Sequence, residues 1–194
     1  MNATPRVVEA GLRDFQCAYE TYVEDPFRLG QLVAVREGPA VTFGVVADIQ
    51  SGAEDPSRPL QSQGEPGQTA AEVMAENPHI RPLLRTRLTV VCCGHIEGEM
   101  PRSALPPIPP PLLALVEPAT VAETIRITSD GAFLALLVDS SVCDDAVIAA
   151  AIRNAAPAFA AGAYDFSVRA GKELARLLKA EPSRLTSILR GVAP

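Results

Sequence analysis

Tryptophan is absent from this chain, and histidine occurs only twice, at His79 and His95. Core packing must therefore depend on leucine, valine, isoleucine and alanine, with a few phenylalanines and tyrosines. The hydrophobic fraction is 47% and the charged fraction 21%, which excludes a disordered chain and indicates a globular protein. A length of 194 residues allows one medium domain, or one small domain with an appendage.

The chain also has few positive charges. Its 17 Lys and Arg residues face 23 Asp and Glu residues, which gives a net charge of −6 at pH 7. Nucleic-acid-binding surfaces are normally basic, so this balance argues against nucleic-acid binding by the whole surface. A local basic patch remains compatible with it.

The sequence also lacks long apolar runs and a spacing of cysteines that would indicate disulfide bonds. No apolar run reaches the roughly 18 to 20 residues that a membrane helix needs. The N-terminus has no apolar stretch of signal-peptide length. The four cysteines (Cys17, Cys92, Cys93 and Cys143) suggest no disulfide pairing. These absences predict a cytoplasmic protein without membrane contact.

The first half of the sequence has the character of β-structure. Alternating residues predict strands over 15–23 and 83–98, and β-branched residues predict a hairpin of 32–35 and 41–49. Gly44 inside the hairpin's second strand predicts a bulge or a tight bend, as at a barrel corner. A polar loop rich in Gly, Pro and Ser is expected over 51–68.

Helices are expected in two places. Thr69 and Glu72 fit a capping box at the start of a short helix. After Pro118 the chain becomes helical, with Asp144 or Asp145 capping one clear helix that ends near Pro157. Strands followed by helices predict an α+β fold. We expect a small β-barrel over 10–120 and a helical subdomain over 121–194.

Two groups of residues are candidates for catalysis or metal binding. The first is Cys92, Cys93 and His95, but adjacent strand residues point to opposite faces, and a metal site needs further ligands. The second is the loop from Asp139 to Asp145, described by its acidic and hydroxyl residues: Asp139, Ser140, Ser141, Asp144 and Asp145. A loop with a helix cap explains this second group more simply. We therefore predict no catalytic, cofactor-binding or metal site, and keep an enzyme using either group as an alternative.

A nucleotide site near Gly171-Lys172 is excluded by the neighbouring residues. A Walker A loop needs glycine where Phe166 stands, and Ser or Thr where Glu173 stands. The one basic cluster of the β half consists of Arg81, Arg85 and Arg87. It could contact phosphate, so direct nucleic-acid binding is a second alternative, or it could protect an exposed strand edge.

The hairpin carries a family resemblance. Gly30-Gln31-Leu32-Val33 forms a G-x-hydrophobic-V strand, and Gly44-Val45-Val46 with Asp48-Ile49 forms a G-x-V strand after a short turn. This arrangement resembles the start of a HAS-barrel, the small β-barrel shared by HerA-type ATPases and ATP-synthase catalytic subunits. The later run "LLRTRLTVV…LPPIPPPLLALVEPAT" resembles stand-alone HAS-barrel proteins of cyanobacteria and their relatives. In HerA-type proteins a proline-containing strand of this kind closes the barrel, so the resemblance implies the same role here.

The resemblance implies a role and also has departures. HerA-type proteins are hexameric DNA translocases that work with a nuclease, and their barrel serves assembly and partner docking. Here no ATPase follows the barrel, and Leu112-Leu113 stand where the family usually has a glycine after the prolines. The resemblance therefore implies a non-enzymatic adaptor for a hexameric ATPase or nuclease, with self-association into a homo-oligomer also open.

The proline-rich run "LPPIPPPLLALVEPAT" has two interpretations. A polyproline segment can dock on a partner's aromatic groove. Prolines on a sheet edge also discourage stray strand pairing, and "LLALVEP" predicts a short strand directly after them. We interpret the run as a structural junction first and a partner surface second. The candidate interaction surface is then Arg81, Arg85, Arg87, Pro107, Pro109 and Pro110.

Overall fold

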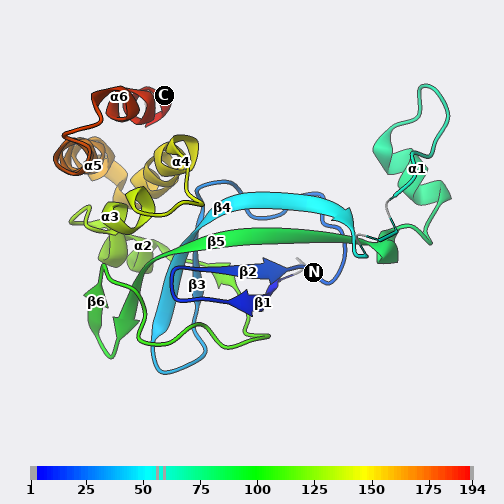
Figure 1. Cartoon of the computed structure of the whole chain (residues 1–194), viewed down its shortest axis with the longest axis horizontal. Helices are drawn as coiled ribbons and strands as arrows, with labels where there is room; N and C mark the ends of the chain where they lie inside the picture. The colour runs from blue at the N-terminus through cyan, green and yellow to red at the C-terminus, as the bar shows by residue number, and fades with distance from the viewer. Residues whose placement is uncertain (1–3, 56, 59, 193–194) are drawn as a thin grey trace.

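The computed structural model describes residues 4–55, 57–58 and 60–192 and confirms the α+β class (Figure 1). One antiparallel sheet has the strand order β1-β2-β5-β4-β3-β7, with β6 beside β5. The strands are β1 (Arg6–Ala10), β2 (Asp14–Ala18), β3 (Leu32–Val35), β4 (Val41–Ala53), β5 (Leu84–Glu97), β6 (Met100–Arg102) and β7 (Glu117–Pro118).

Strands β3, β4 and β5 form the centre of the sheet. The predicted β3–β4 hairpin is present, and β4 continues past the predicted end to Ala53, paired with β5 along its whole length. The register of β4 against β5 shifts between Phe43 and Gly44, which confirms the expected irregularity. A Cβ on Gly44 would lie 2.4 Å from Cγ1 of Val90, so only glycine allows the two strands to approach this closely.

The sheet buries both of its faces in separate hydrophobic cores. Val46 and Val90 pack in an inner core with β1 and β2, whereas their neighbours Val45 and Val91 pack against the helices. This division follows from the two-residue period of a strand. The predicted half-buried strand over 83–98 is therefore correct for its first part only. From Val90 onward both faces are buried, because helices cover the second face.

The helices form a layer on one end of the sheet (Figure 1). They are α2 (Val121–Thr128), α3 (Phe133–Val138), α4 (Asp145–Ala155), the 3-10 segment η2 (Ala156–Gly162), α5 (Ala163–Leu177) and α6 (Pro182–Val192). The Asp144 carboxylate accepts a hydrogen bond from Val147 N (2.9 Å), so Asp144 is the cap of the two predicted candidates, Asp144 and Asp145. Residues 193–194 of the predicted helical subdomain lie outside the described residues.

One helical stretch, Asp145–Leu177, is long and apolar enough to cross a membrane by length and composition alone. It is interrupted at Ala160, whose φ of 48° and ψ of −118° are not helical. Many of its apolar residues, among them Ile148, Ile152 and Leu174, are buried in the core that the helices share with β3, β4 and β5. Core helices of soluble proteins pass the same test, so the stretch is weak evidence for a membrane span.

A lobe of residues 54–83 stands at the far end of the β4–β5 ribbon (Figure 1). It contains α1 (Ala70–Glu76), whose Thr69–Glu72 capping box was predicted, and the short 3-10 helix η1 (Arg81–Leu83). The expected loop over 51–68 begins only after Ala53, because β4 is longer than predicted; its residues 56 and 59 lie outside the described residues. No described residue of the lobe belongs to either hydrophobic core cluster.

Three features of the β region differ from the expectation. Strand β1 precedes the predicted barrel start at residue 10, and β6 was not predicted, because both are short and lack an alternating pattern. The strand expected over 15–23 ends at Ala18; Tyr19 N still donates to Thr86 O of β5 (3.0 Å), and the backbone bends at residues 20–21. The strand expected from "LLALVEP" is reduced to Glu117–Pro118, because residues 112–113 form a turn.

The path of strands is open between β7 and β1, but the chain between them is hydrogen-bonded. Val7 N donates to Ala114 O (3.0 Å) and Leu113 N donates to Val7 O (2.8 Å). One isolated bridge joins Arg6 to Leu115, and β7 pairs with β3. Ala114 and Val116 point into the inner core. Residues 113–118 thus lie between β3 and β1 without forming a continuous ladder.

Candidate functional site

The Cys92–Cys93–His95 group does not form a site. Cys92 lies in the inner core and Cys93 in the core under the helices, as the strand geometry predicts. Burial raises the pKa of the Cys92 thiol to about 12, so it stays protonated near neutral pH and is a poor nucleophile. His95 is buried, and its Nδ1 lies 3.1 Å from Ala104 O.

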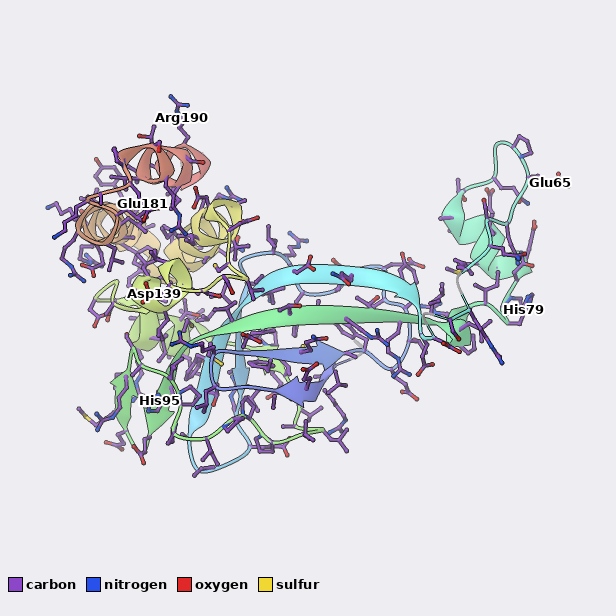
Figure 2. All side chains as sticks on the ribbon, viewed as in Figure 1. Glu65, His79, His95, Asp139, Glu181 and Arg190 are labelled. Atoms are coloured by element: carbon purple, nitrogen blue, oxygen red, sulfur yellow. The ribbon has the colours of Figure 1, made fainter. Side chains whose placement is uncertain are left out.

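A metal site finds no support in the described part of the chain. His79 lies on the lobe, at the opposite end of the molecule from His95 (Figure 2). No group of three or more His, Cys, Asp and Glu side chains among the described residues could hold a metal ion. The two histidines therefore cannot bind the same metal ion, because the β4–β5 ribbon separates them.

The Asp139–Asp145 loop is divided between two roles. Asp144 caps α4, and the Asp145 carboxylate accepts a hydrogen bond from Arg184 Nε at 2.7 Å, which joins α4 to α6. Asp139, Ser140 and Ser141 instead line a cleft of about 400 Å³. The loop therefore contributes its first three polar residues to a cavity and its last two to the structure.

The cleft lies between the β1–β2 turn and the end of α3. Its other lining residues are Arg13, Asp14, Cys92, Leu105 and Leu136. One guanidinium, two carboxylates and two hydroxyls surround a space of small-ligand size, with the protonated Cys92 thiol at its base. Such a lining can hydrogen-bond a small polar molecule. Arg13 and Asp14 were not among the predicted residues, because they lie at the start of β2 and belong to no recognisable motif.

The predicted arginine cluster is not a set of three free cations. Arg85 Nη2 forms an ion pair with Glu54 Oε1 at 2.7 Å. Arg87 Nη2 donates to the Glu54 backbone oxygen at 3.2 Å. Arg81 lies in η1 and lines a different cleft, formed with residues 19–28. Two of the three arginines thus bind the base of the lobe to the ribbon, which reduces the charge available for phosphate.

The predicted proline surface is only partly exposed. Pro107 and Pro109 are exposed, whereas Pro106 and Pro110 are buried. Pro110 therefore presents no surface to a partner, and its place is structural. The segment ends at Leu113, whose φ of 67° lies in the left-handed region that glycine adopts most readily. The side chain of Leu113 is 66% exposed, so packing does not explain leucine at this position.

Arg36 forms an ion-pair group that the sequence did not indicate. It lies directly after β3, and its Nη1 contacts Glu117 Oε2 at 2.7 Å while its Nη2 contacts Glu123 Oε2 at 2.7 Å. Glu123 also completes a capping box with Thr120 at the start of α2. These ion pairs therefore join the end of β3 to β7 and to α2, and so connect the sheet with the helical layer.

Comparison with known proteins finds no protein-family model and no curated protein that this chain matches.

Proposed function

We propose that this chain is a non-enzymatic adaptor built on a HAS-like barrel, acting in the cytoplasm through protein contacts. The proposed partner is a HerA-type DNA translocase or its nuclease, in DNA processing. The observation that carries the proposal is the position of residues 113–118 between β3 and β1. A proline-containing strand that closes the barrel is what the family resemblance implies at this point of the chain.

Leu113 gives the proposal a second line of support. The family usually has a glycine after the prolines, and Leu113 has the left-handed backbone conformation (φ 67°) that favours glycine. A turn of this shape after the prolines is thus compatible with the family's junction, although the side chain differs. This is an argument from backbone conformation and not from sequence identity.

The proposal is tested with the purified chain. Its binding to a purified HerA-type translocase and to the associated nuclease is measured by co-elution, and its own ATP hydrolysis and nuclease activity are assayed. We expect a complex with one of the two proteins and no turnover. Robust turnover of ATP or DNA that is lost on substitution of Asp139 or Cys92 would contradict a non-enzymatic role.

The 400 Å³ cleft supports a second candidate, an enzyme of unrecognised type that uses Asp139, Ser140 and Arg13. The cleft brings together charged and hydroxyl groups from two parts of the chain, which is the arrangement that such an enzyme needs. A screen of small polar substrates against the wild type and Asp139→Asn tests it. Turnover that the substitution abolishes without changing the melting temperature would favour this candidate.

The third alternative, direct nucleic-acid binding, has less support from the arginines. The ion pair of Arg85 with Glu54 uses part of the positive charge that phosphate contact would need. Binding to DNA that weakens with salt and with Arg81→Ala would revive it.

A further inference from the structure

The two ends of the molecule carry opposite charge. Residues 60–80 of the lobe contain three carboxylates, Glu65, Glu72 and Glu76, and no lysine or arginine. At the other end, residues 163–192 contain six Lys and Arg residues (Arg169, Lys172, Arg176, Lys179, Arg184 and Arg190) against three acidic ones. This excess of positive charge stands out in a chain whose net charge is −6.

The acidic end also has an apolar trough. A hollow of about 460 Å³ on the lobe is lined by apolar residues together with four Gln and Ser residues; its apolar members are Leu60, Ala70, Val73, Met74 and Ile80. Ile80 forms a buried base, whereas Leu60 is 51% exposed. The carboxylates of Glu65, Glu72 and Glu76 form no ion pair among the described residues. A partner that fits this lobe therefore needs an apolar side chain and positive charge next to it.

The basic end has a helix face with this chemistry. Tyr164, Val168 and Lys172 follow one another at spacings of four residues, which places them on one face of α5, and Lys179 lies two residues after the end of this helix. Tyr164 is 78% exposed and Val168 37% exposed. Neither lysine forms an ion pair with any described residue. An exposed tyrosine beside positive charge is a common anchor of a protein interface.

These two surfaces cannot meet within one molecule. Figure 1 shows the lobe and α5 at opposite ends of the long axis, and Figure 2 shows Glu65 at one end and Arg190 at the other. The acidic lobe of one copy can instead attract the basic end of a second copy, because each copy presents charges of both signs. A contact between different surfaces of two copies is head-to-tail and continues as a ring or a filament.

We propose that the chain associates head to tail, with the lobe of one copy bound to the outer face of α5 of the next. Tyr164 of one copy enters the trough lined by Val73, Met74 and Ile80 of its neighbour. Lys172 and Lys179 then lie beside the carboxylates of the lobe, Glu65, Glu72 and Glu76. This inference stands apart from the proposed adaptor function, because it uses neither the barrel nor the proline segment.

Sedimentation velocity of the full chain tests the proposal over a range of protein concentration. The salt concentration is raised from about 0.01 M to about 1 M, over which the Debye length falls from about 30 Å to about 3 Å. We expect species larger than a monomer at low salt that dissociate at high salt. A monomer at every concentration at low salt would overturn the proposal, as would association that salt leaves unchanged.

Charge-swap variants identify the surfaces. Glu65→Lys with Glu76→Lys makes the lobe basic, and Lys172→Glu with Lys179→Glu makes α5 acidic. Each double variant alone should associate at least about tenfold more weakly than the wild type, and an equal mixture of the two should associate again. The control Glu20→Lys with Glu97→Lys changes the net charge as the lobe variant does, and it should associate more tightly than that variant.

Association that recovers in the mixture would show that both variants are folded. A misfolded variant could not restore association, so circular dichroism of each variant is measured first. Folded variants that fail to associate in the mixture would overturn the lobe-to-α5 contact.

Discussion

At the scale of single residues, the close approach of β4 and β5 depends on Gly44. A methyl group there would meet Val90 Cγ1 at 2.4 Å and the Val91 oxygen at 3.0 Å. We expect Gly44→Ala to lower the free energy of unfolding by about 1–3 kcal/mol, measured by urea denaturation. Gly52→Ala in the same strand is the matched control, because nothing lies within 4 Å of the added atom. Equal effects of the two substitutions would contradict the close approach.

At Leu113 we expect the opposite result, a substitution that stabilises the protein. An L-residue in the left-handed region costs about 1–2 kcal/mol, and glycine adds about 0.5–1 kcal/mol of unfolded-state entropy. Leu113→Gly should therefore stabilise the protein by about 0.5–1 kcal/mol in the same assay. Leu112→Gly serves as the control, since Leu112 is equally exposed (64%) but has no positive φ. A loss of stability in Leu113→Gly as large as in Leu112→Gly would show that this turn is not strained.

Glu123 connects stability to pH. Burial alone would raise its pKa, but hydrogen bonds from Arg36 and Thr120 outweigh burial and hold the pKa of Glu123 below its usual value. A carboxyl whose folded pKa is lowered contributes stability above its unfolded pKa, about 4.3, and loses it as pH falls through the lowered value. Glu123→Gln should therefore cost about 1 kcal/mol at pH 7 and little at pH 3.

Urea denaturation of the wild type and Glu123→Gln from pH 3 to pH 7 measures this difference. Glu117→Gln is the control, because it removes the more exposed partner of the same arginine, and exposed ion pairs contribute little. A cost of Glu123→Gln that stays constant across the pH range would contradict the ion-pair account.

At the scale of elements, the lobe is an insertion between two paired strands. Ala53 pairs directly with Leu84, so an Asn-Gly turn can replace residues 54–83 and close β4 and β5 as a hairpin. Because both core clusters lie outside the lobe, we expect the melting temperature of this variant to stay within a few degrees of the wild type. Calorimetry measures it, and a variant without a cooperative transition would contradict the lobe's independence.

Local sequence predicted some features of these elements and missed others. Helix caps are local hydrogen bonds, so residue type and spacing alone predicted the Thr69–Glu72 capping box and limited the α4 cap to Asp144 or Asp145. The bend at Gly44 followed from one residue inside an apolar strand. Strand β1 did not, because its five residues pair with β2 through a register shift and are recognised only by the strand that they contact. The ion pairs of Arg36 could not be predicted either, because Glu117 and Glu123 lie 81 and 87 positions after Arg36 in the sequence.

At the scale of the whole molecule, the arrangement of the parts was the least predictable feature. Alternation along β5 indicated one buried face, but the helices bury the second face as well, and that contact depends on residues distant in sequence. The cleft of Asp139 and Arg13 arises in the same way, since β2 and α3 are brought together only by folding. The candidate residues could be named from sequence, whereas their partners could not.

The proposed function requires that the chain bind a protein partner. Its most direct test is sedimentation of the purified chain with a purified HerA-type translocase, and separately with the associated nuclease, at low and moderate salt. The account predicts a complex of defined stoichiometry with one of the two, formed by the wild type and by the variant without the lobe. Independent sedimentation of the chain from both proteins, at concentrations where each is folded, would contradict it.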